Sequence, residues 1–329
     1  MQPATISIIG YGTWATALVY LITQNGYTVN WWVRHSEFKK HIFHYQHNPK
    51  YLPNIRLCLE RINITNLLES VIEGGDLLVF AIPSAYLHPT LAHLKPSLFE
   101  NKVVVSTIKG LDPHHRSLIS QYFFQRFKVS KEQFVVLAGP CHAEEVVQHL
   151  PTYITLAAQR VEHSVLLSRF LINENLKIIF SEDIEGVELA GALKNVYAIG
   201  AGIALGLGCN DNFISVYVAA AHRELTRLLN KYYPCNREPN SSAYLGDLLV
   251  TVFSPHSRNR RLGYWIGEKY TVQEAVNHLQ MVAEGYSAAA VITEIFNKAD
   301  IPIARLIYKV LYHNYEVNFF IEKLKLLLE

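Results

Sequence analysis

A short glycine motif near the start of the chain constrains the fold more than any other feature. The apolar run at residues 6–9 has the length of a buried strand and is followed at once by Gly10-Tyr11-Gly12-Thr13-Trp14-Ala15, which opens the amphipathic segment 14–24. The first glycine permits a tight turn, the second lets the backbone approach a pyrophosphate, and the third position needs only a small side chain. The pattern predicts either a dinucleotide site at the start of a helix or a tight turn that holds no ligand.

The pattern of the chain changes near residue 183. Before this point short apolar runs alternate with helical patterns, which predicts parallel strands covered by helices on both faces. Further strands are expected at 76–82, 102–106 and 134–138, and helices at 85–94, 115–124 and 142–148. Helices alone are expected afterwards, as at 188–199, 214–229 and 272–284. We therefore predict an α/β protein with an N-terminal Rossmann-like parallel-sheet domain at 1–183 and an all-α C-terminal domain at 184–329.

Composition narrows the class of protein. The 329 residues suffice for two domains, and a chain that is 50% hydrophobic and 18% charged is typical of a soluble globular enzyme. A formal net charge of +2 argues against a nucleic-acid partner. The first residues carry neither a basic region nor a long apolar run, so a cytoplasmic location is expected. The four cysteines are far apart and no histidine falls into a metal-ligand spacing, so neither a disulfide framework nor a metal site is expected.

One apolar segment, 189–208, is about as long as a membrane span. It contains Lys194, Asn195 and several glycines, and nothing comparable lies elsewhere in the chain. A buried central helix that runs into a glycine-rich turn explains this composition better than a membrane helix. We therefore expect no membrane insertion.

The end of the second predicted strand indicates which dinucleotide is bound. Folds specific for NAD place an acid there for the ribose diol, whereas an arginine accommodates a 2′-phosphate. The sequence reads Trp31-Trp32-Val33-Arg34-His35-Ser36, with no acid immediately before Arg34, and His35 can add a second donor. This pattern favours NADPH or NADP, with NADH or NAD also accepted. The alternative is that Arg34 is an ordinary surface residue.

Two lysines are placed where chemistry is expected. Lys109 follows the end of a predicted strand, where open α/β sheets bind ligands. Lys194 shares one helix face with small residues, so another part of the chain can approach its ammonium closely. A lysine on such a face acts either as an acid–base group or as a side chain that reaches from a helix end into solvent.

One turn-rich stretch contains three guanidinium groups, an amide and two hydroxyls. It is the decapeptide Ser254-Pro255-His256-Ser257-Arg258-Asn259-Arg260-Arg261-Leu262-Gly263. Planar, permanently charged forks suit bidentate capture of a phosphate or carboxylate. A solvated basic face is the plainer interpretation of such a cluster. The glycine motif and the two lysines favour an anion-binding site.

Several motifs in order resemble the bacterial-type NAD(P)-dependent glycerol-3-phosphate dehydrogenases over nearly the whole chain. They are Gly10–Ala15, Asn48-Pro49-Lys50-Tyr51-Leu52-Pro53, Ile82-Pro83-Ser84, Ile108-Lys109-Gly110-Leu111, Ala138-Gly139-Pro140, Ala143-Glu144-Glu145-Val146, Gly191-Ala192-Leu193-Lys194-Asn195-Val196, Leu245-Gly246-Asp247-Leu248, Ser257-Arg258-Asn259-Arg260-Arg261 and Glu284-Gly285. The resemblance implies that Lys194 is the catalytic acid–base residue, and that Lys109 and Asp247 orient it. The implied substrate-binding residues are Lys109, Gly139, Cys141, Lys194, Asp247, Ser257, Arg258 and Asn259. The implied cofactor-binding residues are Gly10, Gly12, Thr13, Trp14, Arg34, His35, Lys109, Ala143, Arg258 and Glu284.

The resemblance also implies an activity: hydride transfer that interconverts sn-glycerol 3-phosphate and dihydroxyacetone phosphate and supplies glycerol 3-phosphate for phospholipid synthesis. The implied partner is this small phosphorylated substrate, and a homodimer is compatible with it. Two alternatives stay open, a 3-hydroxyacid or ketopantoate-type reductase and a non-catalytic NADPH-binding sensor. The chain departs from the family pattern at Cys141, His142, 208–212, 219–221 and Tyr244. These departures put substrate affinity in question more than the reaction class.

Overall fold

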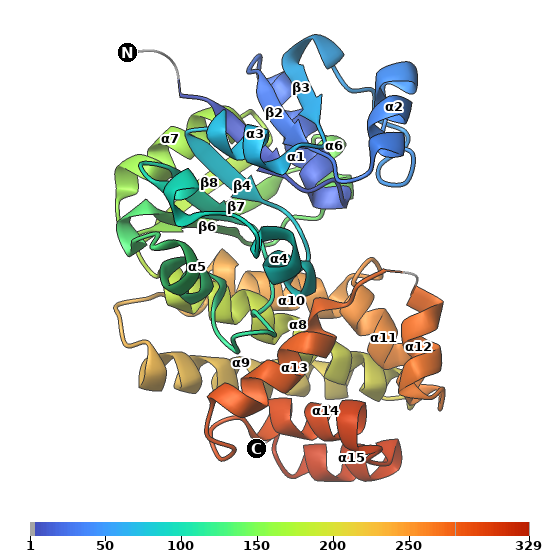
Figure 1. Ribbon diagram of the computed structural model, residues 1–329. Coiled ribbons are helices and arrows are strands. Elements are labelled where there is room, and N and C mark those ends of the chain that lie inside the picture. Colours follow the sequence, from blue (N-terminus) through green and yellow to red (C-terminus); the bar gives the residue numbers. More distant parts are fainter. Residues whose placement is uncertain (1–3, 280, 329) are drawn as a thin grey trace. The chain divides into compact units, whose positions relative to one another are not determined.

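The computed structural model describes residues 4–279 and 281–328, which form two compact units (Figure 1). The first unit contains the chain up to Ile82, Tyr86–Ile108 and Ser120–Ile184. The second contains Pro83–Ala85, Lys109–Ile119 and the chain from Glu185 onwards. Two short segments that follow strands of the first unit therefore pack with the helices of the second. Lys109 is one of the residues that belong to the second unit.

The first unit is built on one eight-stranded sheet in the order β3-β2-β1-β4-β5-β6-β7-β8. The first strand, β1, is an inner strand of the sheet and pairs with β2 and β4. The glycine motif follows its carboxyl end and therefore lies beside the ends of these two strands. This order and the crossover helices confirm the predicted Rossmann-like fold class. The strands are β1 (Ile6–Ile9), β2 (Val29–Trp32), β3 (Ile62–Thr65), β4 (Leu77–Phe80), β5 (Val103–Ser106), β6 (Phe134–Ala138), β7 (Thr152–Ala158) and β8 (Leu176–Ser181).

One neighbouring pair, β6 and β7, is antiparallel, whereas the sequence predicts a parallel sheet. The connection between them contains α6 (Ala143–Val147), a helix of 5 residues. Such a helix is only about 7.5 Å long, too short to carry the chain back along a five-residue strand of about 17 Å. The chain therefore turns directly into β7. Parallel pairing resumes with β8, which follows α7 (Val161–Leu171).

Helices cover both faces of the sheet, as continuous apolar strands require (Figure 1). On one face α1 (Thr13–Gln24) packs with α6 and α7 over a hydrophobic core that includes Ile8, Leu18 and Trp31. A second core is aromatic, with Phe80, Phe99, Tyr122, Phe123, Phe127 and Phe134 in mutual ring contact. The remaining helices of this unit are α2 (Ser36–Tyr45), α3 (Leu68–Glu73), α4 (Ser84–Leu91, whose first residues pack with the second unit) and α5 (Ile119–Phe127).

From Glu185 onwards the described residues of the second unit form helices joined by loops, without a strand, which agrees with the predicted all-α part of the chain. Its central helix is α8 (Ile184–Gly206), in which every residue from 186 to 204 is buried. This helix is long and apolar enough to span a membrane, but 89% of its apolar window is buried inside the structure. The other helices are α9 (Asp211–Tyr232), α10 (Asp247–Phe253), α11 (Arg258–Gly267), α12 (Val272–Leu279), α13 (Glu284–Ile295), α14 (Pro302–His313) and α15 (Val317–Lys325).

α8 and α11 cross with their backbones in direct contact. A Cβ atom on Gly202 would overlap the carbonyl oxygen of Arg260, and one on Gly263 would overlap that of Ile199. Small residues at a crossing let helix backbones approach closely, a type of packing that is common among helices in membranes. The composition that makes this segment look like a membrane span therefore serves close packing within the unit.

Two predicted helices have different bounds in the structure. The helix expected at 115–124 begins only at Ile119, because the Asp112 carboxylate accepts hydrogen bonds from the amides of His114 (3.1 Å) and His115 (3.0 Å) and holds a turn. The helix expected at 272–284 ends at Leu279, and Glu284 starts the next one.

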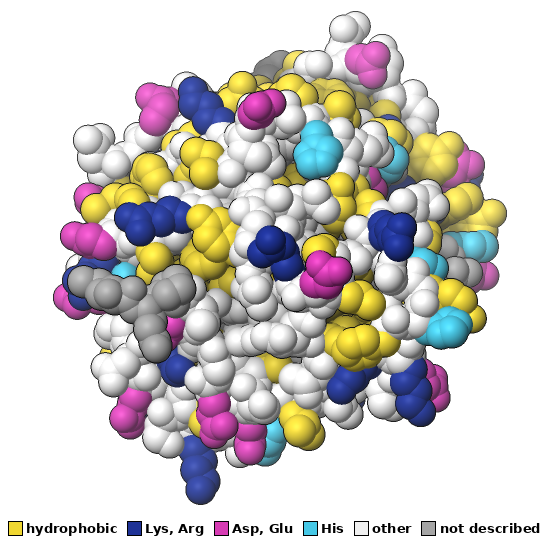
Figure 2. All heavy atoms as spheres, turned by 90° about the horizontal axis from the view of Figure 1, so that it is seen from above, with side chains coloured by type: hydrophobic (Ala, Val, Ile, Leu, Met, Phe, Trp, Pro, Cys, Tyr) yellow, Lys and Arg dark blue, Asp and Glu magenta, His cyan; other side chains and the backbone are white. Residues whose placement is uncertain are grey.

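Charged side chains of both signs are interspersed on the face shown in Figure 2. This distribution agrees with the formal net charge of +2.

Candidate active site

The glycine motif forms the turn between β1 and α1 in the first unit. Gly10 has a φ of +131°, and a Cβ atom there would overlap the carbonyl oxygen of Ala81, so the turn requires glycine. The Gly10 carbonyl oxygen accepts a hydrogen bond of 2.7 Å from Trp31 Nε1. A Cβ atom on Gly12 would meet open space, and no described side chain caps the start of α1 or places an acid in its first turn. An uncapped helix start beside open space fits the pyrophosphate of a dinucleotide.

Asn48 holds this turn in place, a role that the sequence analysis did not assign. Its Nδ2 donates to the carbonyl oxygen of Tyr11 and to Oγ1 of Thr16, both at 2.9 Å. Its Oδ1 accepts from the amides of Lys50 and Tyr51, both at 3.1 Å. Asn48 is fully buried, so these bonds satisfy a polar group that would otherwise destabilise the fold. The only signal in the sequence is an asparagine before a proline within a motif of the family.

Arg34 lies just past the end of β2, as the sequence predicts, and is exposed. It lines a pocket of about 640 Å³, and within the described residues its guanidinium forms neither a hydrogen bond nor an ion pair. His35 turns toward the glycine motif, with its ring 5.6 Å from that of Tyr11. The rest of the pocket is lined by Trp32, Asn66, Leu67, Leu68, Glu69, Ser70, Glu73, Pro89, Thr90 and His93.

Three further predicted residues follow β6 in the first unit. Gly139 has a φ of +112°, and its carbonyl oxygen accepts a hydrogen bond of 3.3 Å from the Cys141 thiol. Ala143 is buried and is the first residue of α6. The sequence analysis noted Cys141 as a departure from the family pattern, and a thiol is a weaker hydrogen-bond donor than a hydroxyl.

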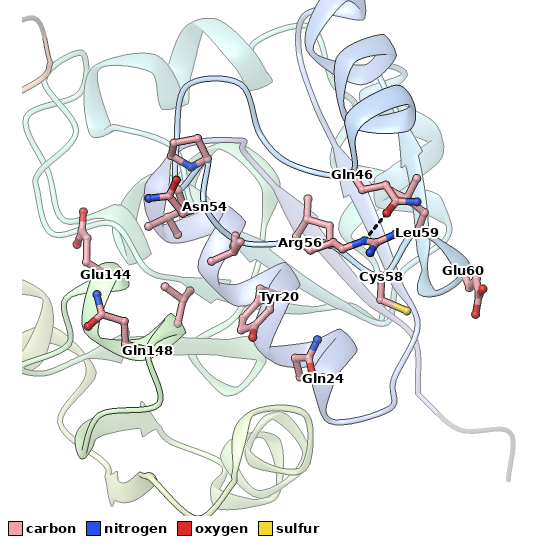
Figure 3. Close-up of a pocket in the computed structure, with 15 residues that line it drawn as sticks. Tyr20, Gln24, Gln46, Asn54, Arg56, Cys58, Leu59, Glu60, Glu144 and Gln148 are labelled. Atoms are coloured by element: carbon pink, nitrogen blue, oxygen red, sulfur yellow. Dashed lines mark hydrogen bonds between the residues drawn. The ribbon is translucent and has the colours of Figure 1, made fainter.

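A larger pocket of about 1020 Å³ also lies in the first unit, between α1, the segment 46–60 and α6 (Figure 3). A hydrogen bond of 2.5 Å joins Arg56 Nε to Gln46 Oε1 at its wall. Its lining contains none of the predicted site residues. Size alone therefore does not locate the candidate site.

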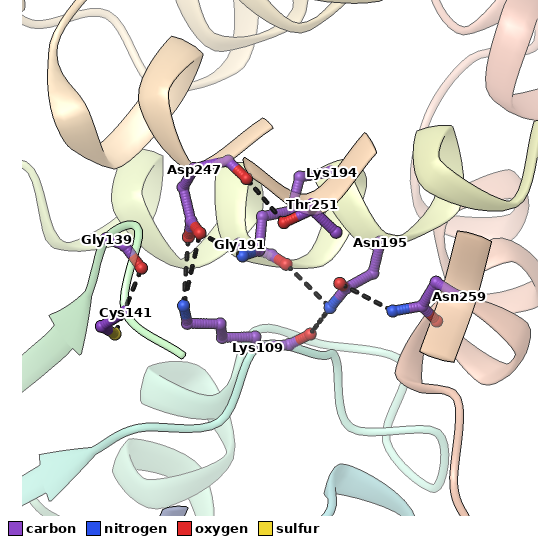
Figure 4. Close-up of polar contacts among 9 residues, drawn as sticks. All are labelled: Lys109, Gly139, Cys141, Gly191, Lys194, Asn195, Asp247, Thr251 and Asn259. Atoms are coloured by element: carbon purple, nitrogen blue, oxygen red, sulfur yellow. Dashed lines mark hydrogen bonds and ion pairs between the residues drawn. The ribbon is translucent and has the colours of Figure 1, made fainter. Parts of the chain in front are cut away.

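The second unit places both lysines on one carboxylate (Figure 4). Asp247, the first residue of α10, accepts a hydrogen bond on Oδ1 from Lys194 of α8. Lys109 Nζ lies 3.2 Å from Oδ2 and 3.4 Å from Oδ1 of the same group. Thr251 Oγ1 fixes the start of α10 through a bond of 2.6 Å to the main-chain oxygen of Asp247. Residues that are 138 and 53 positions apart in sequence thus meet at one point.

The three side chains of this cluster differ in their exposure to solvent. The side chains of Asp247 and Lys194 are 1% and 5% exposed, whereas that of Lys109 is 24% exposed. The carboxylate of Asp247 is thus shared by two lysine side chains. A buried ion pair needs such partners because an unpaired charge would be costly to bury. The hydrogen bond to Asp247 holds the Lys194 ammonium in a fixed direction.

A chain of side-chain amides links this cluster to α11 (Figure 4). Asn195 Nδ2 donates to the main-chain oxygen of Lys109 at 2.7 Å, and its Oδ1 accepts from Asn259 Nδ2 at 2.8 Å. Asn259 Oδ1 in turn accepts from the amide of Gly285 at 2.9 Å. Asn259 was predicted as a substrate ligand, but its side chain is largely used within the protein. The sequence analysis assigned no role to Asn195.

The basic decapeptide does not form an extended turn, because its second half is the first part of α11. Ser257 caps the helix, and its Oγ accepts a hydrogen bond of 3.2 Å from the amide of Arg260. Arg258 follows at the first helical position and is exposed. An exposed guanidinium beside a helix start suits an anion such as phosphate.

Glu284 is already engaged in the second unit. Its carboxylate oxygens accept hydrogen bonds from Ser84, at 2.9 Å from the amide and 2.5 Å from the hydroxyl. Loss of solvent raises the pKa of Glu284, while the Ser84 bonds and the charge of Arg258 oppose that rise. Besides its predicted cofactor role, the Glu284 carboxylate therefore anchors the segment 83–85 through Ser84.

The described residues contain no group of three or more histidine, cysteine, aspartate or glutamate side chains that could hold a metal ion. The four cysteines are free thiols.

Comparison with known proteins assigns the family. A family model described as the N-terminus of NAD-dependent glycerol-3-phosphate dehydrogenase matches residues 5–164, and the corresponding C-terminal model matches residues 183–322. The chain belongs to the NAD-dependent glycerol-3-phosphate dehydrogenase family. A relative from Syntrophomonas wolfei, named glycerol-3-phosphate dehydrogenase (NAD(P)+), is 35% identical over 312 residues, which are 94% of this chain and 91% of the relative. One of the same name from Fusobacterium nucleatum is 34% identical over 94% of this chain and 92% of the relative.

A solved glycerol-3-phosphate dehydrogenase from Coxiella burnetii has the same fold, with a TM-score of 0.90 and 26% identity over 99% of each chain. None of the departures of the present chain replaces either of the two lysines. Ala220 and Ala221 are buried in α9, and Tyr244 is buried in the turn that leads into α10. Lys109, Lys194 and Asp247, which carry the resemblance to glycerol-3-phosphate dehydrogenases, are all retained.

Proposed function

We propose that this protein interconverts sn-glycerol 3-phosphate and dihydroxyacetone phosphate, with NADPH preferred and NADH accepted. The observation that carries the proposal is the pair of lysines on the buried carboxylate of Asp247, in a chain of the glycerol-3-phosphate dehydrogenase family. In this proposal residues 1–183 form the NAD(P)-binding domain and 184–329 the substrate-binding domain. The cellular role is to supply glycerol 3-phosphate for phospholipid synthesis.

The cofactor is held by the first unit. The start of α1, with Gly10, Gly12, Thr13 and Trp14, binds the pyrophosphate; in support, no side chain caps this helix start and a Cβ atom on Gly12 would meet open space. Arg34 and His35 bind the 2′-phosphate. When bound, the nicotinamide supplies or accepts a hydride at C2 of the substrate. Lys109, Ala143, Arg258 and Glu284 complete the proposed cofactor contacts.

Lys194 handles the proton. In reduction its ammonium donates a proton to the C2 carbonyl oxygen, and in oxidation its amine accepts the proton of the C2 hydroxyl. Asp247 keeps the nitrogen in position through its hydrogen bond, and Lys109 on the other oxygen polarises the carbonyl. The fixed geometry of these groups contributes to catalysis because they need little reorganisation during the reaction.

The phosphate of the substrate is bound by Arg258 at the start of α11. The guanidinium is exposed and always charged, and the first amides of the helix add further donors. Ser257, Asn259, Gly139 and Cys141 are proposed as secondary contacts. Asn259 contributes mainly by positioning, since its amide joins Asn195 to Gly285.

A steady-state assay tests the proposal. Dihydroxyacetone phosphate with NADPH or NADH should be reduced, while unphosphorylated dihydroxyacetone should react poorly. Faster turnover of a 2-keto acid would instead indicate a 3-hydroxyacid or ketopantoate-type reductase. Tight NADPH binding without turnover of any of these substrates would indicate a sensor.

The same proposal places the enzyme in the cytoplasm as a homodimer. Sedimentation analysis of the purified protein would test the assembly: a mass of one chain at working concentration would contradict it.

A further inference from the structure

Tyr11, the residue between the first two glycines of the motif, lies against the segment that follows β2. Its ring centroid is 5.6 Å from that of His35, 5.2 Å from that of Phe38 and 6.3 Å from that of Tyr51, each in an edge-on arrangement. Its main-chain oxygen is held by Asn48 at 2.9 Å. The side chain is therefore fixed at the corner where the glycine motif meets the end of β2.

The hydroxyl of Tyr11 is available at this corner. Within the described residues it forms no hydrogen bond, and the guanidinium of Arg34 forms none either. Burial raises the pKa of Tyr11, while the charge of Arg34 acts in the opposite direction. The phenol is therefore neutral near pH 7 and keeps its proton for donation. A guanidinium and a phenol thus lie within electrostatic range of each other, both without a partner.

We infer that the Tyr11 hydroxyl recognises the 2′-phosphate of NADPH together with Arg34, and that it helps to select NADPH over NADH. The inference rests on the proposed function, in which the glycine motif holds the dinucleotide and Arg34 faces the adenosine ribose. A 2′-phosphate is a charged acceptor with three free oxygens, so it can accept from the phenol and from the guanidinium at once. NADH presents only a neutral hydroxyl there, which gains less from the same donors.

Tyr11 also packs against three rings, so its removal could act through packing alone. Tyr11→Phe separates the two roles because it keeps the ring and deletes only the hydroxyl. Tyr27→Phe is the matched control. Tyr27 is in the same unit and is 38% exposed, and its ring packs on Phe170 with the ring centroids 4.7 Å apart.

Dissociation constants for NADPH and NADH, measured by fluorescence titration of the full chain without substrate, provide the test. Tyr11→Phe should weaken NADPH about 10-fold, the scale of a hydrogen bond to a charged group, and NADH less than about 2-fold. Tyr27→Phe should change neither constant. Thermal unfolding of each variant should match the parent protein.

Equal weakening of both cofactors by Tyr11→Phe, or no change in either, would overturn the inference and leave Tyr11 a packing residue. Arg34→Asp distinguishes this failure from failure of the proposed cofactor placement. If Arg34→Asp alters the ratio of the two constants and Tyr11→Phe does not, only the role of Tyr11 is wrong. If neither variant alters the ratio, the adenosine end is not bound at Arg34. The proposed cofactor placement and the proposed role of Tyr11 would then both be wrong.

Discussion

Replacing Lys194 with methionine is the most direct test of the proposed chemistry. Methionine has a similar length but cannot transfer a proton. Asp247 would keep Lys109 at 3.2 Å, an attraction of about 5 kcal/mol at an effective dielectric constant of about 20. That attraction should keep the buried carboxylate paired, so the variant should fold. Turnover should fall by at least about 10²-fold, or about 2.7 kcal/mol in activation free energy, because general acid–base assistance is lost.

The assay is the initial rate at saturating dihydroxyacetone phosphate and NADPH, with NADPH affinity measured separately by fluorescence. Affinity for NADPH should barely change, since Lys194 belongs to the second unit and the proposed pyrophosphate site to the first. Lys109→Met removes the more exposed lysine on the same carboxylate and is compared with Lys194→Met, because Lys109 is itself a proposed substrate contact. Near-normal turnover of folded Lys194→Met would refute the argument and move the proton transfer to another group.

Three further predictions concern other parts of the structure. Arg258→Ala should raise KM for dihydroxyacetone phosphate by about 10-fold or more. The slow reaction of dihydroxyacetone, measured in the same assay, should hardly change. An equal loss of activity toward both substrates would mean that Arg258 has a structural role. Arg34→Asp should weaken NADPH at least about 10-fold more than NADH in binding titrations, and the difference should shrink as salt rises. Burial raises the pKa of Glu224 from 4.5 to about 7, so its contribution to stability is fully present below pH 4.5 and is lost as pH rises through 7. Urea unfolding at pH 5 and pH 8 should therefore show Glu224→Gln gaining on the parent protein by up to about 3 kcal/mol at the higher pH, and a pH-independent difference would exclude this titration.

Patterns within short stretches of sequence predicted the first strand and helix and the central strands of the sheet. The glycine motif required a strand before it and a helix after it, and both are present. Apolar runs indicated β4, β5 and β6 because these central strands are buried on both faces. By contrast β8, at the edge of the sheet, is partly exposed and was missed. The strand β7 was not predicted either, and its direction depends on a connection whose helix, α6, has only 5 residues.

The candidate site shows the same division. Lys109, Lys194 and Asp247 were expected from motifs of the family, and the second unit brings them together. Asn48 and Asn195 were not assigned, because their importance comes from hydrogen bonds to groups distant in sequence. Asparagine alone, without a view of its partners, looks like any polar residue. Contacts of this kind can be identified only once the chain is folded.

The crossing of α8 and α11 has a consequence for which molecules the enzyme can use. Lys194 and the start of α11 belong to helices whose main chains touch at Gly202 and Gly263. No flexible side chain separates the helices there, so we expect a fixed spacing between the proposed proton donor, Lys194, and the proposed anion site at Arg258. This spacing would fit only substrates in which the carbonyl and the phosphate are separated by a matching distance. One extra methylene in the substrate would place one end out of reach, so selection by length would operate without any group that recognises the carbon chain itself.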